Sequence, residues 1–424
     1  MRFRSPLTST LSLVLPRQSV AQKGVLHVGF LAPLSGPLKS WGEPGYHGCI
    51  IWKEWLNARG GLKVGDRHYA VDIIPFDTEF NHEKALEGAR RLYVDHDIQL
   101  LIMLGARDFS RPLRDFINER KSLVTTLFPS DLSPDARTLL APCEVHPIYN
   151  VTGVSWLARS DPSLQTYALC TQNDAQTLPS IATYRAAFEA EGIRCVGERF
   201  FPVETTDFSS IVADLLARKP DILCLDTAYT PFVHAITIEA FRHGFTGRII
   251  SCTCDDYPEL VRKTSPEFMS RFVFQFPDFD DPLLAAPRIN FADPRRFYEE
   301  FCRRFPGTWS AVSWEYASIL EMWKSAVVRA RTCDPQTVLA MMKVGGRGKH
   351  VFGEAHWWGR ELFGVDNALV GDWPVVVIRD GRARIVEFGS TLDWWERNGP
   401  ILIRHMRALG LMWDQREQRL VSSR

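Results

Sequence analysis

The sequence predicts an α/β protein with two Rossmann-like lobes, each built on a parallel sheet that is covered by helices. Its 424 residues are too many for one comfortable core, and 45% of them are apolar, which is enough to fill two cores. Short apolar segments of strand length alternate with longer segments that are apolar at helical spacing. Because this alternation runs once and then restarts, it indicates crossover connections between parallel strands in two similar lobes.

The first lobe is predicted from the N-terminal part of this pattern. Its strands are expected at residues 25–30, 70–75, 98–104 and 123–126. Its helices are expected between the first strand and Gly60-Gly61, from the cap residue Asn81 to about residue 95, and around residues 113–117. A stretch rich in Pro, Ser and Asp at residues 128–150 then marks the boundary between the lobes.

The second lobe is predicted from the part of the chain where the pattern restarts. Strands are expected at residues 166–171, 195–201, 222–226 and 248–252, and helices at residues 178–191, 208–217 and 231–243. Two further helix-like segments follow at residues 294–305 and 312–330. Residues 374–387 predict a β-hairpin, because two apolar runs flank the turn dipeptide Asp380-Gly381.

The loop after the first strand is the most informative local feature. Gly29 to Gly36 indicates a strand that runs into an open loop before a helix, where an α/β fold presents backbone donors to a small ligand. Trp41 lies at the start of that helix. We expect it either to cover a ligand or to pack on the surface.

Charge and cysteine content narrow the partners. Fifty basic and fifty acidic side chains cancel, which argues against nucleic acid or an anionic membrane and favours a neutral or zwitterionic small molecule. The nine cysteines show no paired CxxC spacing, so we expect no disulfide framework and no structural metal. We also expect no cofactor.

The N-terminus has the outline of an export signal. A basic head at residues 1–4, a modestly apolar stretch at 7–15 and small residues at 19–21 predict a signal peptide or, as the alternative, a disordered cytosolic leader. No other run approaches the roughly 18 apolar residues that span a bilayer.

Enzyme motifs are missing from the sequence. No predicted strand is followed by GxGxxG, and the P-loop, the HExxH helix and the GxSxG elbow do not occur. Gly345 to Gly348 lacks both a preceding parallel strand and a later acidic partner. We therefore expect no enzyme, with an α/β hydrolase that uses a dispersed triad as the remote alternative.

Several short sequence segments, taken in chain order, resemble those of a known family. These segments are Gly29 to Gly36, the helix end at residues 57–62, the Asp77 loop, residues 206–212, and residues 363–367 followed by the hairpin. Over about residues 25–387 the chain resembles type I periplasmic binding proteins, the solute-binding subunits of branched-chain amino acid and amide ABC importers (the leucine/isoleucine/valine-binding protein family). The resemblance implies two lobes joined by a three-strand hinge, one ligand between them, a membrane permease as partner, and a periplasmic or extracytoplasmic location.

The resemblance also sets the expected domain boundaries. The first ligand-binding lobe comprises residues 23–145 and 277–347, and the second comprises residues 146–276 and 348–390. Residues 1–22 form the leader. Residues 391–424 form a C-terminal extension, which is either an amphipathic helix packed on a lobe or an interaction surface.

In the first lobe, the loop at residues 106–110 is the main candidate for ligand binding. The family usually places small hydroxyl residues there, but this chain has Ala106, Arg107, Asp108 and Phe109, with Ser110 just beyond. Arg107 is expected either to clamp a ligand carboxylate or to pair with Asp108 at the surface. One of Thr125 and Thr126 matches the family's second hydroxyl contact.

In the second lobe, acidic and aromatic residues follow the strands. Asp174, Asp226 and Asp255 are candidates for binding a ligand ammonium, although Asp174 and Asp226 equally suit helix caps. Tyr229 is the expected aromatic wall of the cleft. Trp314 matches an aromatic residue of amide-binding relatives and is otherwise a core residue.

These observations predict a binding protein that performs no chemistry. It is expected to take an amino acid, an amide or a small carboxylate between its lobes as part of an ABC importer. The alternative is a cytosolic ligand-sensing regulator on the same fold.

Overall fold

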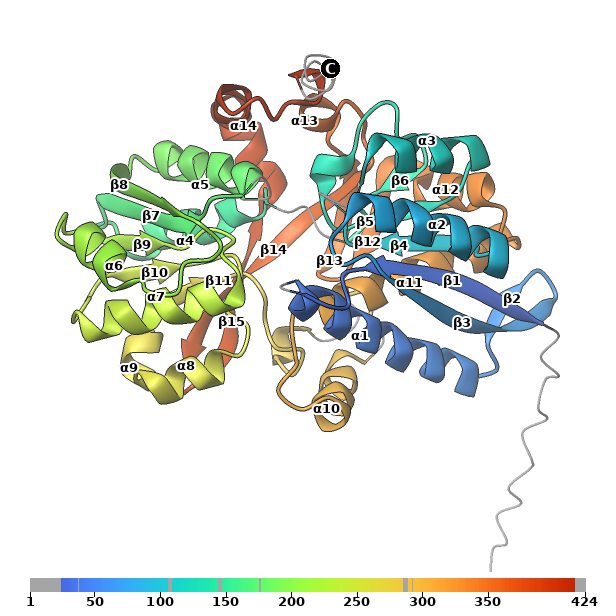
Figure 1. Cartoon of the computed structure of the whole chain (residues 1–424), viewed down its shortest axis with the longest axis horizontal. Coiled ribbons are helices and arrows are strands. Elements are labelled where there is room, and N and C mark those ends of the chain that lie inside the picture. Colours follow the sequence, from blue (N-terminus) through green and yellow to red (C-terminus); the bar gives the residue numbers. More distant parts are fainter. Residues whose placement is uncertain are drawn as a thin grey trace, which may run out of the picture.

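A computed structural model shows two α/β lobes side by side (Figure 1). The structure describes residues 24–36, 38–105, 109–143, 147–174, 177–284, 289–291 and 293–415. Each lobe is built on a sheet, of which the first is mostly parallel and the second has a parallel set of strands extended by antiparallel ones. The predicted fold class is therefore confirmed. Among the described helices, none is both long and apolar enough to cross a membrane.

The first sheet has β1 near its centre, paired in parallel with β3 and β4. Parallel pairing continues outward through β5 and β6, whereas the short β2 forms an antiparallel hairpin with β3. In spatial order the strands are β2 (Leu62–Val64), β3 (Arg67–Asp77), β1 (Val25–Ala32), β4 (Leu100–Met103), β5 (Val124–Thr126) and β6 (Leu139–Leu140).

Helices cover both faces of the first sheet. Along β4, Leu100 and Ile102 join the core beneath α1 and α11, while Leu101 and Met103 join the core beneath α2 and α3. This two-residue alternation is the pattern of a strand buried on both faces. The helices of this lobe are α1 (Lys39–Ala58), α2 (His82–His96), α3 (Arg111–Arg120), α10 (Pro294–Arg304), α11 (Val312–Ala330) and α12 (Pro335–Met342).

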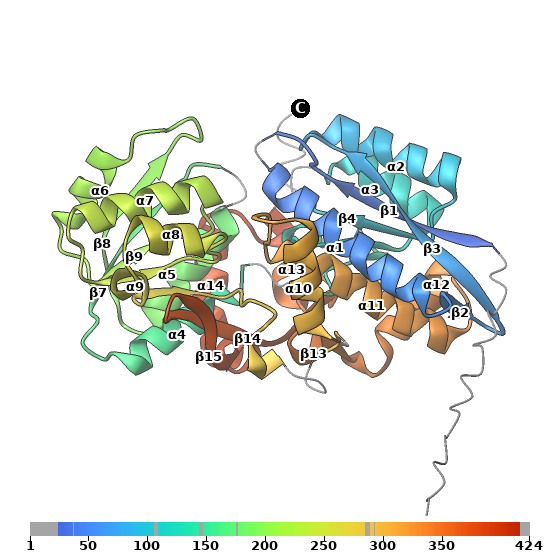
Figure 2. The same cartoon turned by 90° about the horizontal axis from the view of Figure 1, so that it is seen from below.

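One helix cap and one helix contact show how individual side chains position the helices of this lobe. Asn81 caps α2 as predicted, because its side chain accepts hydrogen bonds from the backbone amides of Glu83 and Lys84. Helix α10 lies against α1 on the underside of the lobe (Figure 2), where Trp55 donates a hydrogen bond to Glu300 at 2.9 Å. Residues 294–304 therefore belong with the first lobe although they follow the second in sequence.

The second sheet is larger and mixed. Strands β8, β7, β9, β10 and β11 pair in parallel, and the antiparallel strands β14, β13 and β12 extend the sheet. The strands are β7 (Thr166–Gln172), β8 (Arg194–Phe201), β9 (Ile222–Cys224), β10 (Arg248–Ile250), β11 (Phe272–Phe274), β12 (Arg347–His350), β13 (Gly353–Trp358), β14 (Ala368–Arg379) and β15 (Arg382–Ser390).

The helices of the second lobe again lie on two faces of its sheet. Leu169 and Ile250 pack with the core that includes α4, α5 and α14, whereas Cys170 and Ile249 pack with the core that includes α6, α7 and α8. The helices are α4 (Asn150–Ser160), α5 (Leu178–Ala190), α6 (Ser209–Leu216), α7 (Thr230–Arg242), α8 (Tyr257–Lys263), α9 (Pro266–Met269) and α14 (Thr391–Ala408). A short helix, α13 (Arg360–Phe363), lies between β13 and β14 in the chain.

The chain passes between the lobes along three routes in the part that the structure describes. The first route leads from β6 to α4, the second leads from β11 towards α10, and the third returns through β13 and β14. The family resemblance predicts three crossings of this kind.

The C-terminal hairpin and helix end the described chain. Strand β14 turns into β15 at Asp380 and Gly381, which both have positive φ, as the predicted two-residue turn requires. Helix α14, within the predicted extension, begins at the cap residue Ser390 and packs on α5 and β14. It is thus a packed helix of the second lobe over the residues that the structure describes.

A close helix contact fixes the first lobe. A Cβ atom added at Gly48 of α1 would lie 1.8 Å from the carbonyl oxygen of Ser313 in α11, which is far inside van der Waals contact. The two helices approach each other closely because residue 48 has no side chain.

We expect Gly48→Ala to destabilise the protein by about 1–3 kcal/mol, because the new methyl group would push α1 away from α11. Urea unfolding followed by circular dichroism measures this change. The control is Ser40→Ala on the exposed face of the same helix, which we expect to alter stability by less than about 0.5 kcal/mol. Equal stability of the two variants would contradict the close contact.

Candidate ligand-binding cleft

A small cavity lies where the carboxyl ends of strands from both lobes face each other. Its volume is about 40 Å³, which is room for only a few water molecules, because the lobes touch around it. The first lobe lines it with Trp41, Leu104, Leu127, Phe128, Ser310, Ala311, Val312 and Glu315. The rest of the lining is Tyr149, Thr227, Cys252, Thr253, Asp255 and Phe276.

Trp41 and Tyr229 connect the lobes at the edge of this cavity. Their rings meet edge to face with centroids 5.4 Å apart, a favourable geometry for aromatic pairs. The Tyr229 hydroxyl donates to the Asp174 carboxylate at 2.8 Å, and the same carboxylate accepts from the Thr177 backbone amide at 3.0 Å. The structure therefore brings three of the predicted residues into one chain of contacts, in which Asp174 holds both the tyrosine and the start of a helix.

Asp255 makes a polar contact across the lobes. Its carboxylate accepts hydrogen bonds from Ser310 of the first lobe at 3.4 Å and from Thr230 at 3.3 Å, and its carbonyl oxygen lies 2.8 Å from His234 Nε2. The residue is partly exposed, but its carboxyl group is desolvated, which raises the pKa of Asp255 to about 6. Asp255 is thus an acidic group of the cleft wall whose charge costs free energy to bury.

Asp226 lies deeper, below the cleft at the end of β9. It is fully buried in a left-handed backbone conformation, and its main-chain carbonyl accepts from Cys252 and Ser251. Desolvation raises the pKa of Asp226 to about 7, partly offset by the nearby Ser180 hydroxyl. Its carboxyl group lies in the core of the second lobe and is not part of the cavity lining.

Thr125 and Thr126 are fully buried beneath the cavity. The Thr126 hydroxyl accepts from the backbone amide of Phe128 and lies 2.7 Å from the Asp131 carboxylate, so it shapes the loop that carries cavity residues. The Thr125 hydroxyl has no hydrogen-bond partner among the described residues. Neither threonine lines the cavity, so the structure does not bring these two predicted residues to its wall.

The loop that contains Arg107 is only partly described. Ala106, Arg107 and Asp108 lie outside the described residues. Phe109 packs against the core on the α2 and α3 side, and Ser110 is the N-cap of α3, with its hydroxyl accepting from the Leu113 amide at 3.5 Å.

Trp314 lies in the core. It is fully buried, and its ring stacks on Phe279 with centroids 5.0 Å apart. It does not line the cavity, but the cavity residues Ala311 and Val312 come from the start of the same helix.

Sequence reasoning missed most of the apolar wall. Leu127 and Phe128 directly follow a predicted strand, so their position was a usable signal. Tyr149 lies in the crossing segment and was not predicted. Its hydroxyl is 3.2 Å from the Cys252 sulfur, and its ring stacks on Trp373.

The prediction that no metal is bound remains a prediction. Across the described part of the chain, no group of three or more potential metal-binding side chains comes together.

Two sheet-based lobes, joined by crossing segments and facing each other across a lined cavity, define a two-lobed solute-binding architecture. The chain belongs to the periplasmic binding protein family, which matches residues 25–383. The predicted resemblance to type I periplasmic binding proteins is confirmed.

Solved structures with the same fold include two kinds of binding protein. A leucine-binding protein from Thermotoga maritima has a TM-score of 0.69 and 16% identity, and the match covers 87% of this chain and 99% of that one. An ABC transporter solute-binding protein from R. palustris, in complex with 4-hydroxybenzoate, has a TM-score of 0.68 and 15% identity over 87% and 98%. A second one from Rhodopseudomonas palustris BisB5, in complex with 3,4-dihydroxybenzoic acid, gives the same four values.

The raised pKa of Asp226 predicts a pH-dependent stability. Between about pH 4 and pH 7 the folded protein keeps a proton on Asp226 that the unfolded chain has released, so this residue's contribution to stability falls as pH rises through that window. We expect Asp226→Asn to remove this dependence. Its stability relative to wild type should rise by about 2 kcal/mol between about pH 5 and pH 8, measured by urea unfolding.

Asp207→Asn is the control for this measurement. Asp207 is exposed, and hydrogen bonds from Ser209 lower its pKa, so its removal should not change the slope in this window. A wild-type slope retained in Asp226→Asn would show that the buried carboxyl group is already ionised at about pH 5.

Proposed function

We propose that this protein is an extracytoplasmic solute-binding subunit of an ABC importer and that it performs no chemistry. It closes its two lobes on an amino acid, an amide or a small carboxylate and presents the closed form to membrane permease subunits. The observation that carries this proposal is the cavity lined from both lobes, with the Trp41–Tyr229 and Asp255–Ser310 contacts across it. A ligand that contacts both walls stabilises the closed arrangement over the open one.

The lining supports a small, partly apolar solute. Leu104, Leu127, Phe128 and Phe276 supply apolar walls, while hydroxyl and carboxyl groups such as Thr253 and Asp255 can orient a polar end. The solved relatives named above include a leucine-binding protein and two proteins in complex with aromatic acids. Arg107 remains the proposed clamp for a carboxylate ligand.

The extracytoplasmic location is proposed from the N-terminal signal-like sequence together with membership of a periplasmic binding protein family. Mapping the mature N-terminus of the native protein tests it. A start near Gln22 is the expected result, and a retained Met1 would favour the cytosolic ligand-sensing alternative.

Titration calorimetry tests solute binding. The panel comprises leucine, phenylalanine, acetamide, urea, benzoate and 4-hydroxybenzoate, each titrated into the full chain. We expect at least one compound to bind with one-to-one stoichiometry and to remain unchanged after prolonged incubation. The absence of binding across the panel would count against the proposed ligand classes, and turnover of a compound would overturn the non-enzymatic function.

For whichever panel compound binds, we expect Trp41→Ala to weaken binding by about tenfold, because the closed form loses the edge-to-face contact with Tyr229 and part of the cavity wall. The control is Trp395→Ala, which removes an indole that packs on Trp358 away from the cavity. The control should keep its affinity within about twofold. Equal loss in both variants would mean that Trp41 acts through stability alone.

A further inference from the structure

A second and larger cavity, here called the side chamber, adjoins the cleft. Its volume is about 180 Å³, against about 40 Å³ for the cleft cavity, and the two share Asp255, Phe276 and Ala311 as lining residues. At roughly 10–15 Å³ for each water-sized sphere, the side chamber has room for about a dozen. It is therefore large enough for a group of several heavy atoms that the cleft cavity alone does not accommodate.

Aromatic rings from both lobes wall the side chamber. Tyr257 begins α8 of the second lobe, whereas Tyr298 lies on α10, which packs on the first lobe. Trp309 follows α10, and its ring meets Tyr298 edge to face at 4.7 Å between centroids. Faces of Tyr and Trp rings carry negative potential, so a chamber walled by them favours a positively charged guest.

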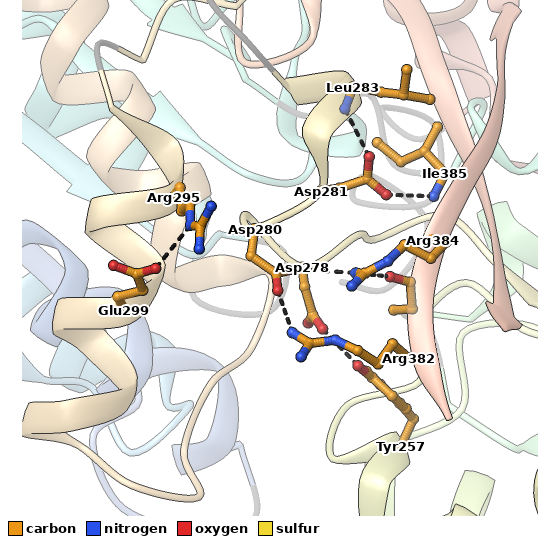
Figure 3. Close-up of polar contacts among 11 residues, drawn as sticks. Tyr257, Asp278, Asp280, Asp281, Leu283, Arg295, Glu299, Arg382, Arg384 and Ile385 are labelled. Carbon is orange, nitrogen blue, oxygen red and sulfur yellow. Dashed lines mark hydrogen bonds and ion pairs between the residues drawn. The ribbon is translucent and has the colours of Figure 1, made fainter. Parts of the chain in front are cut away.

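The charged side chains that line the side chamber are all acidic among the described residues. Among the described residues that line the side chamber, three are aspartates (Asp255, Asp256 and Asp278) and none is Lys, Arg or His. The nearby arginines, Arg382 and Arg384, pair with Asp280 instead (Figure 3). The carboxylates of the chamber therefore have no cation in direct contact within the described lining.

Asp278 is the most constrained of these carboxylates. Only 4% of it is exposed, and it accepts a hydrogen bond of 2.6 Å from the Tyr257 hydroxyl (Figure 3). Burial, with a smaller contribution from the charge of Asp280, raises the pKa of Asp278 to about 6 against the opposing effects of the Tyr257 hydrogen bond and the more distant arginines. The buried charge is thus incompletely compensated, and a cation in the chamber would compensate it.

The hydrogen bonds already formed select the type of cation. One oxygen of Asp278 is engaged by Tyr257, and Asp255 accepts from Thr230 and Ser310. A primary ammonium group brings three N–H donors that each need an acceptor, whereas a quaternary ammonium group brings none. Aromatic walls suit the quaternary group, which they hold through cation–π attraction and apolar contact.

We propose that the side chamber binds the quaternary ammonium group of a small organic solute, with Asp278 opposite the charge and the rings of Tyr257, Tyr298 and Trp309 around its methyl groups. This inference rests on the proposed function, since it names the chemistry of one end of a solute held between the lobes. The polar or carboxylate end of such a solute would lie in the adjoining cleft cavity.

The test compares a cation with its neutral isostere. Choline, tetramethylammonium and 3,3-dimethyl-1-butanol are each titrated calorimetrically into the full chain. We expect both cations to bind and the neutral alcohol to bind at least about tenfold more weakly than choline. Equal binding of the alcohol and choline overturns the inference, and so does the failure of both cations to bind. If the cations fail while an amino acid, amide or carboxylate binds, the proposed function stands and only this inference falls.

Two matched variants locate the site. Asp278→Asn and Glu299→Gln each remove one negative charge near the side chamber, but only Asp278 lines it, whereas Glu299 is exposed and pairs with Arg295 on the outside of α10. We expect Asp278→Asn to weaken choline binding by about tenfold and Glu299→Gln to change it by less than about twofold. Equal effects of the two variants overturn the assignment.

Trp309→Leu provides a second test if Asp278→Asn does not fold. Trp309 is partly exposed, and leucine keeps an apolar contact at this position while removing the ring face. We expect choline binding to weaken by about fivefold while binding of 3,3-dimethyl-1-butanol stays within about twofold. Unchanged choline affinity in Trp309→Leu overturns the cation–π arrangement.

Discussion

Strand β14 is the element on which the arrangement of both lobes depends. Near its start it pairs with β13, and Ala368 bridges to Ala141 at the end of the first lobe's sheet. Further along it pairs with β11 and β15 of the second lobe. A strand that is hydrogen-bonded at both ends cannot shift its register without turning buried side chains outward. The position of the cleft therefore follows from one strand, because β14 fixes where the two sets of strand ends meet.

Acidic groups between the lobes affect the free energy of bringing the lobes together. Desolvation raises the pKa of two carboxyl groups that line the interlobe cavities, those of Asp255 and Asp278. Removing water from like charges makes their repulsion stronger, so an empty closed form is penalised unless protons are taken up. A solute that brings positive charge, or hydrogen-bond donors, relieves the same penalty. In the proposed function, ligand and protons would therefore act on the same equilibrium between open and closed forms.

The sequence predicts local structure here better than it predicts the site. The strands at residues 25–30 and 166–171 and the turn at Asp380-Gly381 are visible because their signals, apolar runs and turn dipeptides, are local. Strands β11 to β13 are short and lie near the crossings, so nothing local distinguishes them. Tyr149 reaches the cavity only through the first hinge crossing, and Ser310 reaches it from the loop between α10 and α11. Asp174 suits either a helix cap or a ligand contact from its sequence. Its contact with the Tyr229 hydroxyl arises only from the tertiary structure, because the two residues lie far apart in sequence.

The second crossing links the hinge to the side chamber. It carries Phe276 and Asp278, and just beyond them Asp280 and Asp281 tie the segment to β15 through Arg382, Arg384 and the Ile385 amide (Figure 3). One wall of the chamber is therefore fixed to the second lobe. Tyr298 and Trp309, on the opposite wall, move with α10, which is bound to the first lobe through Arg304 and Glu54. Because the two walls belong to different lobes, any group that contacts both is bound only when the lobes are together. In the proposed function, a group bound in the side chamber would therefore contribute binding free energy to closure itself.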